Sequence, residues 1–124
     1  MKYRKLPHGE EKITILGLGT SSIGMAGEKE AEATMAMALE NGINYFDMAS
    51  DAAPFPAFGR ALAEKRKDVY FQIHFGANYQ SGKYGWTTDL DTIKRSIEWQ
   101  LKSLQTDYID FGFMHCIDEK SDLQ

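Results

Sequence analysis

The chain has 124 residues, of which 43% are hydrophobic and 26% are charged, a composition typical of one soluble globular domain and not of a disordered chain. Its formal net charge of −4 argues against nucleic acid as a partner, because phosphate binding needs a basic surface. No run reaches the roughly 18 apolar residues of a membrane helix, and the single cysteine, Cys116, excludes an intrachain disulfide, so we expect a cytoplasmic protein without a membrane partner.

The first half of the chain predicts a short hairpin followed by two strands and two helices. Alternating apolar residues and β-formers mark the strands, whereas apolar residues recur along one face of the first helix, with Gly42 as its predicted stop. The predicted elements are a hairpin in residues 1–11, strands at 12–20 and 43–49, and helices at 28–42 and 55–66.

The second half predicts a strand, a long loop, a helix and a final strand. Apolar residues at spacings of three and four run from Leu90 to Leu104 and mark the helix. Thr88 with Asp91 resembles a capping box at its start. The predicted strands are residues 69–75 and 108–115.

The order β-α-β-α-β-α-β predicts an α/β fold with a parallel sheet, because strands joined by helices run in the same direction with right-handed crossovers. Only nine residues, 116–124, follow the last strand, so we expect no covering helix there. An uncovered apolar edge strand is a liability in a free-standing protein. We therefore expect a piece of a larger protein, or a homo-oligomer that forms through exposed sheet edges.

Ligands of parallel α/β sheets lie at the carboxyl ends of the strands, where this sequence carries one acid and two imidazoles. Gly19 and Thr20 end the first strand, Asp47 ends the second, and His74 and His115 end the third and fourth. Because the fold brings these ends together, we expect Asp47, His74 and His115 to face one ligand.

The loop at residues 76–88 is long, because βα connections usually take about 2–6 residues. Its glycine-rich frame carries Tyr79, Tyr84 and Trp86, together with Lys83. Such a loop is either a lid or substrate wall, or a packed surface loop, and the sequence leaves both readings open.

Two other kinds of site stay open from the residues alone. Gly17 and Gly19 precede Asp47 as in a dinucleotide-binding βαβ unit, although the next glycine comes two places late for the fingerprint. In a metal-dependent hydrolase, Asp47, His74 and His115 would be three ligands of a catalytic zinc, although they come one per strand and without a paired motif.

In order and spacing, four segments resemble the aldo/keto reductase family: ILGLGTSSIG, NGINYFDMA, RKDVYFQIHF and LKSLQTDYIDFGFMH. The family fold is a TIM-type (β/α)8 barrel with a short N-terminal hairpin, and such a barrel takes about 250 residues. The resemblance therefore implies that residues 1–124 form a single partial (β/α) barrel domain that holds the first four strands.

The family reduces small carbonyl compounds with NADPH and uses an Asp, a Tyr, a Lys and a His. A general acid is needed because the carbonyl oxygen must be protonated when its carbon receives hydride. By this resemblance Asp47 matches the family's Asp and His115 matches its His. Gly19, Thr20 and Asp47 match positions near the nicotinamide end of the cofactor.

The family's tyrosine and lysine are missing from their usual places. The tyrosine position holds Ala52, or Asp51 if a gap of one residue is allowed, and His74 stands in place of the lysine. Three explanations stay open: His74 is the acid, a tyrosine of the long loop moves in with Lys83, or the site has lost carbonyl reduction and only binds. We favour the first, because an imidazole donates a proton readily near neutral pH.

The segments FDMAS and IHFGA also resemble a branch of the family from anaerobes that carries a C-terminal ferredoxin-like domain with two 4Fe-4S clusters, and this chain contains none of that domain. Most NADPH contacts of the family come from the last strands of the barrel. We therefore expect the 124-residue chain alone to bind NADPH weakly or not at all, and to be inactive. The alternative is a non-enzymatic half-barrel module that associates with a copy of itself.

Overall fold

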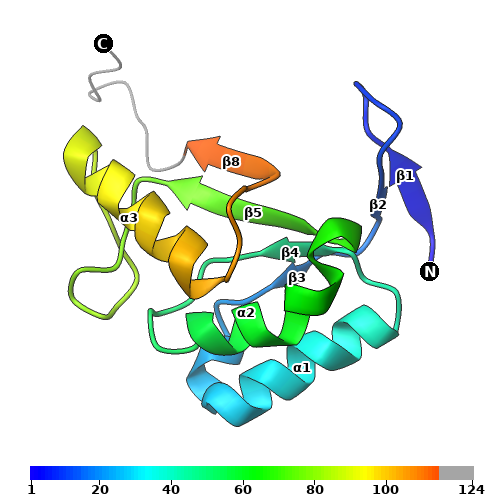
Figure 1. Ribbon diagram of the computed structural model, residues 1–124, viewed down its shortest axis with the longest axis horizontal. Helices are drawn as coiled ribbons and strands as arrows, with labels where there is room; N and C mark the ends of the chain where they lie inside the picture. The colour runs from blue at the N-terminus through cyan, green and yellow to red at the C-terminus, as the bar shows by residue number, and fades with distance from the viewer. Residues whose placement is uncertain (115–124) are drawn as a thin grey trace.

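A computed structural model describes residues 1–114, which are organised around a four-stranded parallel sheet (Figure 1). The strands lie in the order β3 (Leu18–Gly19), β4 (Tyr45–Asp47), β5 (Tyr70–Phe75) and β8 (Phe111–Met114), and each is parallel to the next. The expected parallel sheet is therefore confirmed. Because the spatial order follows the chain without reversal, the sheet lacks the switch point of a dinucleotide-binding βαβ fold and has the strand order of a (β/α)8 barrel.

Three helices connect successive strands and cover one face of the sheet. They are α1 (Glu28–Glu40), α2 (Phe55–Leu62) and α3 (Leu90–Ser103), with short 3-10 turns η1 (Ile23–Ala26) and η2 (Ala63–Asp68). On the covered face, Phe46, Phe71 and Ile73 are fully buried against these helices. Because strand side chains alternate, Asp47, Gln72 and His74 point to the opposite face.

The predicted N-terminal hairpin is confirmed, with β1 (Tyr3–Lys5) antiparallel to β2 (Lys12–Thr14). The predicted single strand at 12–20 is wrong, because residues 12–14 belong to this hairpin and only Leu18–Gly19 join the sheet. Hydrogen bonds of Thr14 explain the break: its N–H donates to Asn44 Oδ1 and its hydroxyl donates to Leu16 O. These bonds turn the chain between the two strands.

The helix ends also differ from the sequence expectations. Asp89 is the N-cap of α3 and accepts a 2.8 Å hydrogen bond from the Thr92 N–H, so the predicted capping box of Thr88 and Asp91 is wrong. The helix predicted to reach residue 66 ends at Leu62 and continues as η2. No helix within residues 1–114 is long and apolar enough to cross a bilayer.

The long loop after β5 is not irregular, because it contains a two-stranded antiparallel ribbon. We call residues 76–88 the ribbon segment; its strands are β6 (Ala77–Asn78) and β7 (Gly85–Trp86). The segment closes on itself at its base, where Thr87 N–H donates to Gly76 O at 2.7 Å. The ribbon therefore rises from the carboxyl end of β5, where a ligand site is expected.

Candidate active site

The structure brings Asp47 and His74 together at the carboxyl ends of two adjacent strands. Asp47 ends β4 and His74 lies near the end of β5, on the face away from the helices. The Nε2 atom of His74 lies 2.8 Å from Asp47 Oδ1, and both side chains are partly exposed. The third expected member, His115, lies outside the described residues, as does Cys116.

Thr20 fixes the backbone of Asp47 and does not present its hydroxyl to solvent. The hydroxyl donates to Asp47 O at 2.9 Å and accepts from the Ala49 N–H at 2.9 Å, and the residue is fully buried. Gly19 lies opposite Asp47 in the sheet register, and nothing comes within 4 Å of the position that a side-chain carbon would take there. The carboxyl-end rim of the sheet beside Asp47, at Gly19, therefore presents backbone atoms and no side chain.

A phenol from the ribbon segment completes a row of three polar groups. The Tyr84 hydroxyl lies 3.2 Å from His74 Nδ1, so the imidazole is hydrogen-bonded on both of its nitrogens. The rings of His74 and Tyr84 meet edge to face, with centroids 6.4 Å apart. Asp47, His74 and Tyr84 thus form a continuous hydrogen-bonded row, which we call the relay.

The other aromatic residues of the ribbon segment point elsewhere. Tyr79 is buried against Phe55 and Trp99, with ring centroids 5.0 and 4.8 Å away, and its hydroxyl has no hydrogen-bond partner among the described residues. Burial raises the pKa of Tyr79, so its phenol stays neutral. Trp86 is 61% exposed. The ribbon segment is therefore packed against the helices at Tyr79 and lies beside His74 at Tyr84, and its role as a lid or substrate wall stays a prediction.

Asp51 anchors the ribbon segment beside the relay. Its carboxylate accepts from the Tyr84 N–H and from Lys83 Nζ, each at 2.8 Å. The hydrogen bond from Lys83 and then that from Tyr84 hold the pKa of the Asp51 carboxyl below its usual range, and the same pair raises the pKa of Lys83. Lys83 is thus bound to Asp51.

Sequence reasoning missed three residues on the face of the sheet that carries the relay. Tyr45 and Gln72 each lie two positions before a relay residue, and the Tyr45 hydroxyl donates to Gln72 Oε1. Burial and, secondarily, the charge of Asp47 raise the pKa of the Tyr45 phenol. Phe113 lies opposite His74 in the register of β5 and β8 and adds an apolar surface. The alternation of side chains along each strand, with a period of two, is the signal that could have identified them.

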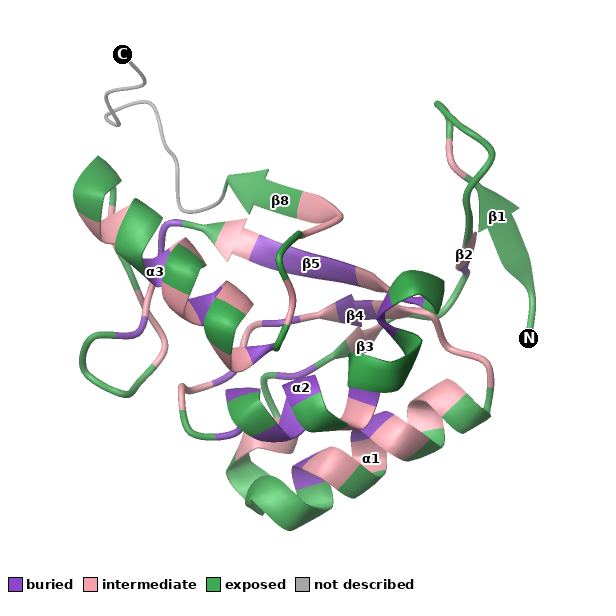
Figure 2. Ribbon diagram, viewed as in Figure 1, coloured by how far each residue is buried: buried purple, intermediate pink, exposed green. Residues whose placement is uncertain are grey.

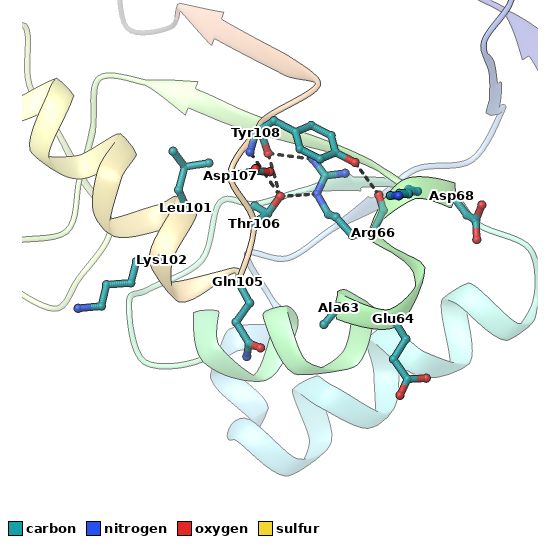
Figure 3. Close-up of a pocket in the computed structure, with 11 residues that line it drawn as sticks. Ala63, Glu64, Arg66, Asp68, Leu101, Lys102, Gln105, Thr106, Asp107 and Tyr108 are labelled. Atoms are coloured by element: carbon teal, nitrogen blue, oxygen red, sulfur yellow. Dashed lines mark hydrogen bonds between the residues drawn. The ribbon is translucent and has the colours of Figure 1, made fainter.

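A cavity of about 860 Å³ lies at the other end of the sheet, where strands begin (Figure 3). Its wall includes the Arg66 side chain, which donates to Thr106 Oγ1 at 2.8 Å and to Tyr108 O at 2.9 Å, as Figure 3 shows. The guanidinium also stacks on the Tyr108 ring, 3.8 Å from its centroid, and pairs with Asp110. We interpret the contacts of Arg66 as structural, because ligand sites of such sheets lie at the carboxyl ends of strands, at the opposite end.

Within residues 1–114 no group of three or more His, Cys, Asp or Glu side chains is arranged to hold a metal ion. The zinc set that the sequence left open needs His115, which lies outside this part of the chain. Among the described residues only its Asp47 and His74 members come together, and they bond each other.

The sequence profile of the aldo/keto reductase family matches residues 15–124. This chain belongs to the aldo/keto reductase family. It is 32% identical to the uncharacterized oxidoreductase YqkF of Bacillus subtilis, over 93% of this chain and 39% of that protein. It is 28% identical to L-galactose dehydrogenase of Arabidopsis thaliana, over 95% of this chain and 38% of that enzyme. This aldo/keto reductase chain therefore spans about two fifths of the length of these curated relatives.

Solved structures of aldo/keto reductases agree with the sheet and helix arrangement. The holo form of AKR11C1 from Bacillus halodurans superposes with a TM-score of 0.78 at 32% identity, over 93% of this chain and 40% of that one. An aldo/keto reductase of Klebsiella pneumoniae, solved with NADP and acetate, superposes with a TM-score of 0.65 over 86% of this chain and 36% of that one. At 22% identity the second likeness shows the fold alone.

The polar residues at this end of the sheet bear on the family's catalytic set. By the resemblance described above, the family's tyrosine position is expected at Ala52 or Asp51 and its lysine position at His74, and this assignment stays a prediction. The structure adds that Asp51 holds the backbone of Tyr84, whose hydroxyl reaches His74. A phenol, a basic group and a carboxylate therefore still meet at this rim, although the phenol comes from the ribbon segment.

Proposed function

We propose that this chain supplies the substrate-facing half of the active site of an aldo/keto reductase-type oxidoreductase, which reduces small carbonyl compounds with NADPH. The observation that supports this most is the 2.8 Å contact of Asp47 with His74 at the carboxyl ends of adjacent parallel strands. In this proposal His74 is the source of the proton that the carbonyl oxygen needs, given either directly or through a neighbouring hydroxyl, Asp47 orients the imidazole, and His115 contacts the carbonyl.

Two features of the described rim support the binding of one end of a dinucleotide there. Beside Asp47, Gly19 leaves open space where any other residue would place a side chain, so a flat ring has access to the backbone there. Thr20 holds the Asp47 backbone from beneath, through a hydroxyl with both hydrogen-bond roles in use. We propose that Gly19, Thr20 and Asp47 form this edge of the cofactor site. NADPH, when bound, would supply the hydride.

The chain spans about two fifths of its curated relatives, and we propose that it is inactive alone. A titration of the 124-residue chain with NADPH, followed by cofactor fluorescence, should show no saturation in the micromolar range. Micromolar affinity would contradict this. From the resemblance and the composition we further propose a small carbonyl substrate, a cytoplasmic location, and iron–sulfur clusters in a longer protein.

A chimaera tests the function itself. The 124 residues replace the matching segment of AKR11C1 from Bacillus halodurans, and NADPH oxidation is measured with a panel of aldehydes and ketones. We expect turnover that His74→Ala lowers by about 100-fold or more while the NADPH dissociation constant stays the same. His8→Ala, in the exposed hairpin turn, is the matched control. An unchanged rate in the His74→Ala chimaera would overturn the proposed role.

A second candidate function is a self-associating half barrel without enzymatic activity. Figure 2 shows β8 exposed along the sheet edge, where Met114 is 67% exposed; beside β3, at the other edge, Leu16 is 58% exposed. Parallel pairing of β8 with β3 of a second copy would close eight strands around a twofold axis. Sedimentation of the 124-residue chain distinguishes the cases: a dimer favours this candidate, and a monomer with a cooperative melt contradicts it.

A further inference from the structure

The relay has the form of a carboxylate, an imidazole and a hydroxyl in a row, in which the hydroxyl belongs to the ribbon segment and not to a strand. Deepening the function proposed above and resting on it, we propose that Tyr84 is the catalytic phenol of this site and that Asp47 activates it through His74. His74 is then a positioning and proton-relaying residue, and Tyr84 is the group that meets the substrate oxygen.

The hydrogen-bond chemistry fixes the direction of the relay. An ionised carboxylate is only an acceptor, so the proton of the 2.8 Å contact between His74 and Asp47 lies on Nε2. A neutral imidazole that carries its proton on Nε2 has Nδ1 as an acceptor. The Tyr84 hydroxyl, 3.2 Å away, therefore donates to Nδ1. When the ring carries a second proton, on Nδ1, that N–H donates to the Tyr84 oxygen instead.

These two states correspond to the two directions of one reaction. In alcohol oxidation, Tyr84 gives its proton to His74 Nδ1 and takes the hydroxyl proton of the alcohol, which loses hydride from its carbon. In carbonyl reduction, Tyr84 gives its proton to the carbonyl oxygen and takes one from the Nδ1–H of His74. Atoms balance in both directions, because the hydride is exchanged with the nicotinamide dinucleotide of the proposed function.

The contacts around the relay single out Tyr84 among the nearby phenols. Tyr79 is buried against aromatic rings, and Tyr45 donates to Gln72 on the sheet. Tyr84 alone of these three has its hydroxyl within hydrogen-bond distance of His74 in the contacts described. Asp51 accepts from the Tyr84 N–H and holds the phenol at that place, so the ribbon need not move to present it.

Chemical labelling of the chain itself tests the proposal without cofactor or substrate. The 124-residue protein is treated with limiting N-acetylimidazole, which acetylates phenol oxygens, and the products are mapped by peptide mass spectrometry. Tyr84 should react at least about tenfold faster than Tyr3, because His74 takes its proton as acetyl transfer begins. Tyr3 is an exposed phenol in the same sample and serves as the internal reference. A difference in solvent exposure cannot make Tyr84 react faster than Tyr3, because Tyr84 is the less exposed of the two.

Two variants separate activation from packing. His74→Gln should reduce the Tyr84 rate to that of Tyr3, and Asp47→Asn should do the same by favouring the wrong imidazole tautomer. Asp47→Asn keeps the side-chain volume and decides the matter if His74→Gln fails to fold by circular dichroism. Equal rates for Tyr84 and Tyr3 in the unaltered chain, or a fast Tyr84 in both variants, would overturn the proposal.

The two proposals fail separately. An active chimaera with slow Tyr84 labelling would retain the oxidoreductase function and remove the role of Tyr84. Fast, His74-dependent labelling with an inactive chimaera would retain the activated phenol and remove the oxidoreductase function.

Discussion

Asp51 holds Tyr84 from 33 positions away in the sequence, through a 2.8 Å hydrogen bond from the Tyr84 N–H to the Asp51 carboxylate. Asp51 follows β4, and Tyr84 belongs to the ribbon segment after β5. One surface carboxylate therefore couples two neighbouring βα connections and sets where the Tyr84 phenol meets His74.

Loss of the Asp51 carboxylate should loosen the ribbon segment. In Asp51→Ala, we expect hydrogen exchange at the Tyr84 amide to quicken strongly, because its acceptor is gone. Lys83→Met removes the ion pair but keeps that acceptor, so it should quicken the same amide much less. The measurement is amide exchange by NMR at neutral pH. Equal exchange in the unaltered chain and in Asp51→Ala would show that the ribbon is held by its packing alone.

The same anchor should respond to acid. Because Lys83 and the Tyr84 N–H hold the pKa of Asp51 below its usual value near 3.8, the folded state binds this proton less readily than the unfolded state. The contribution of Asp51 is therefore present above the unfolded pKa and is lost as pH falls through the lower folded pKa. The Tyr84 amide resonance, followed by NMR titration, should shift with a midpoint below 3.8.

Two variants control for other groups that titrate in this range. Asp51→Asn should abolish the shift of the Tyr84 amide, and Lys83→Met should move its midpoint upward because the first cause of the lowered pKa is removed. A midpoint of 3.8 or above in the unaltered chain would contradict the anchor.

The opposite end of the sheet depends on Arg66, whose guanidinium lies 2.8 Å from Asp110 in a mostly buried ion pair. Arg66→Met removes the guanidinium that pairs with the Asp110 carboxylate and donates to two backbone carbonyl oxygens, so we expect a loss of about 3–5 kcal/mol in the free energy of unfolding. Urea denaturation measures it. Lys67→Met, at the exposed neighbouring position, should change stability by less than about 0.5 kcal/mol. Similar effects of both variants would refute the structural role of Arg66.

The sequence could predict the sheet and part of the relay because both follow from local patterns. In a β-α-β order the carboxyl ends of successive strands lie at one edge of the sheet, and this rule predicted that Asp47 lies near His74. The hairpin boundary was missed because the turn after Thr14 depends on Asn44, 30 residues away. The alternating pattern of residues 12–20 cannot indicate a hydrogen-bond partner so far away in the sequence.

The sequence could not predict the contact of Tyr84 with His74, for the same physical reason. Tyr79 and Tyr84 are both aromatic residues of one loop. Long-range contacts decide that Tyr79 is buried and that Tyr84 lies beside His74. Tyr79 packs on Phe55 and Trp99, whereas Asp51 captures the backbone of Tyr84. No local propensity distinguishes two phenols five positions apart in a glycine-rich segment.

Two glycines offer a matched pair for testing the packing that supports the site. At Gly59 on α2, an added side-chain carbon would stand 2.7 Å from the backbone oxygen of Ser103, at the end of α3. Since backbone atoms cannot turn aside as a flexible side chain does, Gly59→Ala should cost about 1–3 kcal/mol of stability by forcing the two helices apart. At Gly19 the added carbon meets nothing within 4 Å, so Gly19→Ala should leave the melting temperature of the chain nearly unchanged. Thermal unfolding followed by circular dichroism compares them, and a larger loss at Gly19 than at Gly59 would show that the space beside Asp47 is not open.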